Sequence, residues 1–464
     1  MRKAFFTIWV LGGILFCLGG ALAREGPPQD GTDGFDWGTV EKLDLETSQR
    51  IALSENPSIA AARDRIRQAR ERVRQARATY WPTLDASASY SRVSLPQSSL
   101  LGFGPMPGVP LAINDPEDYY DIDLKANWVL FRGLERIYAN KGARAAEQGS
   151  QEAERDARRL LLSSVANSFY RAQLAREEIA IGGANEDFNR KQAEDAKARQ
   201  RVGTGSLSDV LNFEVQVNAA KAELINARRA YEVAMFGLAA LVGISEGTFP
   251  SDLDLIRLEQ ETAEELAAPE PEGHVAYAKQ NRTDILQAQY AVTQAQQAIG
   301  VARAPFFPAF NFSASLDGQR LGDTGFEEDD FGNTIALGFS YNLFSGGYDL
   351  ARVGEARARR DEAKKTLANL TNNVVSEVRT AITRVAAAQQ ELLLQRSNAA
   401  LVQQNRDLVE KEYAAGQGSL VRLNEAQRDL VTAQSRLALA LVSLRLAWQN
   451  LLATTGEILV SHAD

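Results

Sequence analysis

Two long stretches of this chain carry the same heptad pattern of apolar residues, and the second lies 213 residues after the first. The first pattern consists of Val210, Val217, Leu224, Tyr231 and Leu238, and the second of Leu423, Leu430, Leu437, Leu444 and Leu451. A Gly-x-Gly-Ser-Leu sequence precedes each pattern, at 203–207 and 416–420, and a glycine follows each. A duplication of this length predicts two copies of one structural unit in a single architecture.

The duplication extends beyond the heptads. The sequence Trp-Val-Leu-Phe-Arg-Gly at 128–133 matches Tyr-Asn-Leu-Phe-Ser-Gly at 341–346. At a slightly larger offset, 76–82 matches 302–308, and both of these segments end in two aromatic residues and a proline. Proline stops a helix because it removes a backbone donor and clashes with the preceding turn. Each half therefore reads as helix, strand pair, very long helix, glycine turn and helix.

Four segments, two in each half, alternate between apolar and polar residues. Within 310–316, for example, Phe310, Phe312 and Ala314 alternate with polar residues. This period predicts strands with one apolar face, at about 83–93, 119–131, 309–317 and 333–344. A soluble sheet with one wet face would show the same alternation. Two matched hairpins with aromatic residues at the strand ends favour strands that cross a membrane.

The first 23 residues have the pattern of a cleaved secretory signal peptide. Arg2 and Lys3 precede an apolar core over 5–18, and Ala21-Leu-Ala23 is a small-residue cleavage site. The only cysteine, Cys17, lies in this segment, so we expect a mature protein without disulfides. Loss of the two basic residues changes the formal net charge from −9 to −11. This acidic balance disfavours nucleic acid as a partner.

Two helical patterns are exceptionally long, from about 134 to 200 and from 347 to 413. At 1.5 Å per residue, each would reach roughly 100 Å. Such a length is typical of a coiled coil or a tube and not of a globular domain. No other stretch has the ~18 uninterrupted apolar residues that a membrane-spanning helix needs.

The same patterns divide the chain into segments. We expect an extended N-terminal segment at 24–45, a first repeat at 46–243 and a second repeat at 276–456. The linker at 244–275 is rich in acidic residues and proline, and we expect it to be partly ordered and solvated. Residues 457–464 form a C-terminal tail in this division.

Four membrane strands cannot stand alone, because hydrocarbon offers no water to the two unpaired edges of the sheet. A closed barrel needs at least about eight strands. The chain should therefore contribute its strands to a homo-oligomeric barrel, with eight strands from two copies or twelve from three. Because the long helices leave the same end of both hairpins, they should continue the barrel as a helical tube. The sequence thus predicts a conduit from the outer membrane into the periplasm.

These features resemble the TolC family of outer-membrane efflux proteins. The resemblance covers about residues 45–456 and rests on the order of the duplicated helix–hairpin–helix units. Its markers are Asn56-Pro and Asn281 at helix starts, the aromatic-Pro strand entries, the Leu-Phe-x-Gly strand exits and the glycine-serine-leucine turns. No single marker is strongly specific; their order and duplication carry the resemblance.

The resemblance implies a mainly α-helical fold and a homotrimer. The trimer would form a 12-stranded β-barrel in the lipid of the cell outer membrane, a 12-helix barrel in the periplasm and an equatorial belt around the helices. It also implies docking to a periplasmic adaptor protein and to an inner-membrane pump of the RND or ABC type. The chain would be the exit duct of an efflux or type I secretion system, without enzymatic activity and without a cofactor. Drug efflux and protein secretion both stay open, because substrate choice resides largely in the pump.

The two glycine turns are the candidate functional site under this resemblance. Family members close the tube at the second turn, usually with acidic residues. The positions that match are Arg422 and Glu425 in the second repeat, and Asp209 and Asn212 in the first. Tyr413 matches a family aromatic residue that helps to hold the tips shut.

Arg422 departs from the family's acidic pattern at this closure. It puts a purely anionic gate in doubt and permits an Arg422–Asp209 pair between neighbouring hairpins. The tips that would face the adaptor are Val202, Gly203, Thr204, Ala415, Gly416 and Gln417. Solvated helix ends, with glycines that only make the turn, would give the same residue pattern.

Enzyme interpretations find little support. His274 and His462 are the only histidines, so a histidine-based metal site or catalytic triad is not credible. The Gly203-Thr-Gly205-Ser segment lacks the lysine of a phosphate-binding loop. The competing class is a trimeric coiled-coil protein of the cell surface with a structural or adhesive role. That class explains the heptads and the signal peptide, but not two strand hairpins from which long helices return to the same end.

Overall fold

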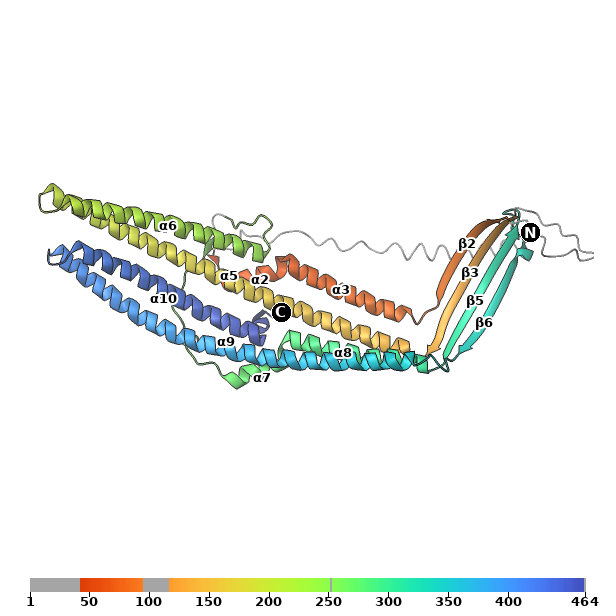
Figure 1. The fold of residues 1–464 in the computed structure, drawn as a ribbon. Helices are drawn as coiled ribbons and strands as arrows, with labels where there is room; N and C mark the ends of the chain where they lie inside the picture. Colours follow the sequence, from red (N-terminus) through yellow and green to blue (C-terminus); the bar gives the residue numbers. More distant parts are fainter. Residues whose placement is uncertain (1–41, 95–116, 251–252, 463–464) are drawn as a thin grey trace, which may run out of the picture.

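The computed structural model describes residues 42–94, 117–250 and 253–462. Four strands lie together at one end of an elongated molecule, and the long helices extend from them to two turns at the opposite end (Figure 1). The fold is mixed and mainly α-helical. The signal peptide, most of the expected N-terminal segment and Cys17 lie outside the described residues.

The helices and strands follow the same order in both halves. The helices are α2 (Leu45–Glu55), α3 (Pro57–Ala78), α5 (Glu135–Arg201), α6 (Leu207–Val242), α7 (Pro271–Asn281), α8 (Thr283–Arg303), α9 (Tyr348–Ala414) and α10 (Leu420–Thr455). The strands are β1 (Lys42–Leu43), β2 (Thr83–Val93), β3 (Glu117–Arg132), β4 (Asp254–Leu255), β5 (Ala309–Leu321) and β6 (Phe331–Ser340). Short 3-10 helices η2 (Ala304–Phe306), η3 (Glu328–Asp330) and η4 (Glu457–His462) complete the described elements.

The long helices α5 and α9 have 67 residues each, and their return helices α6 and α10 have 36 each. Ser206 and Ser419 cap the return helices, since each hydroxyl accepts a backbone N–H of the first turn. Gly243 and Gly456 end them in the left-handed conformation, at φ 95° and 89°. Identical lengths and caps make the two helical hairpins copies of one unit.

The heptad residues form the core of these hairpins. Leu423, Leu444 and Leu451 are fully buried, and so is Leu238 of the first repeat. The adjoining seam carries small residues, and Ala433 among them is buried. Helix α10 is also the one described helix that is long and apolar enough to cross a membrane, with a mean hydropathy of 1.3 over 18 residues. Its apolar residues instead pack against α5 and α9 in the helical bundle.

The four long strands form one antiparallel sheet in the order β2-β3-β5-β6. One face is apolar, with rows such as Leu84, Ala126, Ala314 and Ile335 across the four strands. The opposite face is polar, and its rows include Ser87, Asp123 and Asp317. The two faces match the alternation in the sequence, because side chains directly opposite each other across a sheet share a face.

Three strands have boundaries that differ from the predicted ranges. Strand β3 covers 117–132 instead of 119–131, and β5 continues to Leu321 instead of ending at 317. Strand β6 begins at Phe331 and ends at Ser340, whereas the alternation predicted 333–344. Its neighbour β5 begins at Ala309, opposite Ser340, so residues beyond Ser340 have no strand to pair with among the residues that the structure describes.

The linker between the repeats is partly ordered, and many of its residues, such as Glu259, Glu264 and Glu270, are exposed. Its leucines pack into the helical core, with Leu255 fully buried beside Phe169. The side-chain amide of Gln173 in α5 donates to the backbone oxygens of Ile256 and Arg257, at 3.2 and 3.1 Å. Its acidic residues pair with helix arginines, as in Arg445–Glu265 at 3.2 Å. The linker thus ties the two helical hairpins together.

The C-terminal end of the linker and the C-terminal tail both contain helical structure. Helix α7 begins at Pro271, inside the range 244–275. At the C-terminus, residues 457–462 form η4, and Ile458 packs with Leu162 and Ala453. Strand β1 pairs in parallel with β4, so the start of the described chain is held against the linker.

Candidate functional site: the tips of the helical hairpins

Two glycine turns close the helical hairpins at the end of the molecule opposite the sheet (Figure 1). Gly203 and Gly416 adopt φ 78° and 75°, a conformation that favours glycine. The second glycine of each turn is needed for close packing: a Cβ on Gly205 would lie 2.8 Å from the Arg199 Cβ, and one on Gly418 would lie 3.0 Å from the Tyr413 nitrogen. The turns are therefore tight for reasons of backbone geometry.

All six residues predicted at the adaptor-facing tips are exposed in the chain. Val202 is 74% accessible. The other five, which are also exposed, are Gly203, Thr204, Ala415, Gly416 and Gln417. An apolar side chain held at a turn with this exposure is available for contact with another molecule.

An apolar cluster lies directly beneath the tips and joins the two hairpins. Phe213 and Leu423 are fully buried, and they pack with residues of all four helices. The cluster consists of Ala193, Ala196, Val210, Phe213, Val409, Leu423 and Ala426. Because it holds α5, α6, α9 and α10 together, this cluster fixes the distance between the two turns.

Tyr413 connects the two hairpins at the edge of that cluster. Its ring lies 6.2 Å from the Phe213 ring at an interplanar angle of 70°. The Arg199 guanidinium lies 5.2 Å from the centre of the Tyr413 ring. Burial raises the pKa of the Tyr413 phenol, the Asp209 carboxylate raises it further, and Arg199 lowers it. Tyr413 therefore joins the two hairpins through Phe213 of α6 and Arg199 of α5.

Arg422 does not pair with Asp209 in the chain. Its guanidinium lies 3.0 Å from the Glu412 carboxylate, across the turn of its own hairpin. Of the other predicted aperture positions, Asn212 accepts a hydrogen bond from the Asn424 side-chain amide at 2.8 Å. Glu425 is exposed. The Arg422–Asp209 pair is therefore not a contact within this protomer, where Arg422 pairs with Glu412.

Sequence reasoning missed a set of buried amides between the hairpins. The Gln192 amide donates to the Glu410 carboxylate at 3.2 Å. The Gln427 amide of α10 donates to the Asn185 side-chain oxygen of α5 at 3.0 Å. Asn185, Asn189 and Gln192 recur at the helical spacing of a buried face, and this spacing was the signal that could have found them.

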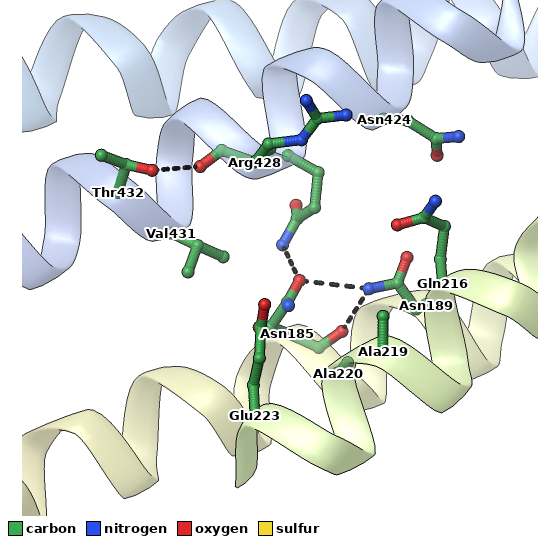
Figure 2. Close-up of a pocket in the computed structure, with 11 residues that line it drawn as sticks. Asn185, Asn189, Gln216, Ala219, Ala220, Glu223, Asn424, Arg428, Val431 and Thr432 are labelled. Carbon is green, nitrogen blue, oxygen red and sulfur yellow. Dashed lines mark hydrogen bonds between the residues drawn. The ribbon is translucent and has the colours of Figure 1, made fainter. Parts of the chain in front are cut away.

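These amides border a polar pocket of about 180 Å³ between α5, α6 and α10. Figure 2 shows Asn185 and Asn189 on one side and the α10 residues Arg428 and Thr432 on the other. Gln427 is 8% exposed, and its side-chain oxygen has no hydrogen-bond partner among the described residues.

Comparisons with known proteins agree with this arrangement. The sequence profile of the family described as "Outer membrane efflux protein" matches residues 50–244 and 275–457. The pyoverdine export outer membrane protein OpmQ of Pseudomonas aeruginosa is 25% identical over 417 residues, which cover 89% of this chain and 84% of OpmQ. Protein CyaE of Bordetella pertussis is 27% identical over 445 residues, which cover 94% of this chain and 87% of CyaE.

A solved structure has the same fold. The outer membrane protein VceC of Vibrio cholerae superimposes with a TM-score of 0.71 at 20% identity, over 90% of this chain and 98% of VceC. The family profile covers both repeats and leaves out only the termini and the linker. The chain therefore belongs to the outer membrane efflux protein family.

Proposed function

We propose that three copies of this chain form the outer-membrane exit duct of an efflux or type I secretion system. The observation that supports this proposal most strongly is the strand order β2-β3-β5-β6. This order leaves β2 and β6 as the two edges of a sheet with one apolar face. Open edges are not tolerated in a lipid bilayer. Three copies would supply twelve strands and remove every edge, with the apolar face toward lipid and the polar face toward the lumen.

The helices support the same closure. Beyond the sheet, α3 packs on α5, α5 on α8 and α8 on α9, so that α3 and α9 are the outer members of this layer. Nearer the tips the order is α6, α5, α10 and α9. Helices α6 and α9 expose large apolar residues at heptad spacing, including Leu211 and Ile225 on α6 and Leu394, Leu401 and Leu408 on α9. Such stripes fit a ring in which one edge of each copy meets the opposite edge of the next.

The partners would be a periplasmic adaptor protein and an inner-membrane pump, of the RND or ABC type. Proteins similar in sequence include the toluene efflux pump outer membrane protein TtgC of Pseudomonas putida and the alkaline protease secretion protein AprF of Pseudomonas aeruginosa. The exposed tips are the surface that such an adaptor would contact. Tyr413 and Asp209, with Asn212, Arg422 and Glu425 nearby, would form the periplasmic aperture around the three-fold axis.

The chain would pass its cargo without chemical change. Among the described residues, no group of three or more His, Cys, Asp or Glu side chains could hold a metal ion. The surface-adhesin alternative has no support from the relatives, whose names describe export, secretion and efflux.

Native mass spectrometry of the detergent-extracted protein tests the assembly. The expected mass is that of three chains. A stable complex of two chains would still close a barrel of eight strands, and it would show that the assembly is a dimer and not a trimer. A stable monomer that spans lipid would overturn the proposal, because this sheet cannot close on itself.

A further inference from the structure

A groove of about 390 Å³ lies between α8 and α9 of the same chain, where these helices meet the sheet (Figure 1). Phe306, Phe307 and Leu350 line it, and their exposed fractions are 42, 50 and 70%. Arg303, the last residue of α8, and Arg357 of α9 border the same groove. The groove therefore combines three exposed apolar side chains with two cationic ones.

Neither arginine has an acidic partner in the part of the chain that the structure describes. Arg303 and Arg357 are exposed and form no ion pair there, although the chain has a formal net charge of −9. By contrast, Arg359 on the same helix pairs with Glu355 at 2.6 Å. Two free guanidinium groups beside an apolar groove suit a ligand that carries a phosphate on an apolar body.

The groove lies beside the end of the apolar face of the sheet. In β5 and β6 this face ends with Phe310 and Phe339, whose ring centres are 5.3 Å apart. Arg303 and Phe307 come just before β5 in the chain. Aromatic and basic side chains gather where hydrocarbon meets water, because that boundary accepts both an apolar body and a polar end. The groove therefore has the position and the composition of a membrane boundary.

A surface that lines an aqueous lumen would have a different composition. The polar face of the sheet, which would line the lumen, presents Asn311, Ser313 and Ser315 along β5. The groove presents phenylalanine and leucine instead, and contact of these side chains with water is unfavourable. Both walls of the groove belong to one chain, so the groove exists without a neighbouring copy. Lipid therefore fits the groove better than an anion dissolved in water.

The first repeat carries the same types of residue at the positions equivalent to Arg303, Phe307 and Arg357. These residues, given by the match of 76–82 with 302–308 and by the offset of 213, are Arg77, Trp81 and Arg144. Trp81 is 74% exposed, and neither arginine forms an ion pair with another described residue. Two free arginines and an exposed aromatic side chain thus occur at the same junction in both repeats, which is a second, independent indication of a binding site.

We infer that the groove between α8 and α9 binds an anionic phospholipid of the membrane leaflet that borders the periplasm. Arg303 and Arg357 would hold the phosphate, because a guanidinium group can donate two parallel hydrogen bonds to phosphate oxygens. Phe306, Phe307 and Leu350 would contact the first carbons of the acyl chains. The inference rests on the proposed duct, which places lipid against the apolar face of the sheet. Lipids held here would fix the height of the duct in the membrane.

Photolabelling of the protein in lipid vesicles tests this site. The probe is a phosphatidylglycerol that carries a diazirine next to its headgroup, diluted into phosphatidylcholine. After irradiation the protein is cut at acidic residues, so that arginine variants give the same peptides, and labelled peptides are identified by mass spectrometry. We expect label on the peptides that contain Phe307 and Leu350. Combining Arg303→Gln with Arg357→Gln should reduce this label about tenfold, because each arginine beside an anionic headgroup contributes to binding.

Two further variants separate the groove from a general effect of charge. Arg352→Gln with Arg359→Gln removes the same charge from the same end of α9, but neither residue lines the groove. This control should change the label by less than about twofold. Gly354→Leu keeps both groove arginines and fills the space between them. A Cβ at Gly354 meets no atom within 4 Å, and leucine favours a helix more than glycine does, so the variant should fold. We expect it to reduce the label several-fold.

Equal losses of label in the groove variant and its charge-matched control would overturn the site, and so would unchanged labelling of Gly354→Leu. Equally strong label from a phosphatidylcholine probe would show that the lipid need not be anionic and would overturn the stated ligand. Competition by an excess of glycerol phosphate would show that the groove takes a soluble phosphate instead of a lipid. The label is measured per chain, so a protein that forms no trimer would contradict the proposed duct while this result could still be read.

Discussion

At the scale of single residues, Tyr413 should hold the aperture more strongly than Arg422. Tyr413 contacts the Phe213 ring and lies under Arg199, so it joins the two hairpins. Arg422 forms an exposed ion pair within its own hairpin, and such a pair contributes only about 0–1 kcal/mol. We expect Tyr413→Ala to raise single-channel conductance and Arg422→Ala to leave it nearly unchanged. The opposite ranking, with trimers intact, would place the closure at Arg422.

The sequence located some of these residues and missed others for a physical reason. Tyr413 was named from the family resemblance and Asp209 from the matching position of the first turn, and their role at an aperture stays a prediction. Gln192 and Gln427 lie on buried helix faces, where a polar residue reads as an interruption of the pattern. Whether such an amide has a partner depends on the other hairpin, and the sequence gives no distance between the two.

At the scale of the strands, a charge on the apolar face should be far more costly than one on the polar face. Leu124 lies between Ala86 and Leu316 on the apolar face of β3, and Asn127 lies between Thr83 and Ser313 on the other. Leu124→Arg should lower the free energy of unfolding in lipid vesicles by about 2–4 kcal/mol near the bilayer midplane. Asn127→Arg is the control and should have a small effect. Equal losses would mean that both faces meet the same environment.

At the scale of the helices, the small residues of α10 should be needed for close packing. Ala433 is buried, and Ala433→Leu should overfill its contact and lower the free energy of unfolding by about 1–3 kcal/mol. Arg436 is exposed on the same helix, so Arg436→Ala should change it by less than about 0.5 kcal/mol. Chemical denaturation of the two variants compares them. A larger loss for the arginine variant would show that the seam is assigned to the wrong face.

Helices and strands with a strong periodicity of apolar residues could be predicted from the sequence. Segments whose position depends on residues far away in the sequence could not. The two 67-residue helices begin and end within one residue of the predicted ranges. The sequence did not show where the linker packs, because the helix residues around Leu255 and the arginine that pairs with Glu265 lie far from the linker in the sequence. Strand β6 ends early because the strand that would extend it belongs to another copy in the proposed ring.

At the scale of the whole molecule, duplication explains why one chain is incomplete. Each repeat presents a first edge and a second edge, and within the chain the second edge of repeat one is covered by the first edge of repeat two. Two edges stay open at the ends, in the sheet as β2 and β6. A ring of identical copies repeats the internal contact at every junction, which makes closure a property of the sequence itself.

Electrical conductance of a planar lipid bilayer containing the purified protein tests the central claim, a water-filled duct, most directly. We expect discrete conductance steps from the wild-type protein and larger steps from Tyr413→Ala, because the lumen is continuous and the tips limit the current. Complexes that insert into the bilayer yet leave its conductance unchanged, in the wild type and in Tyr413→Ala alike, would contradict the account.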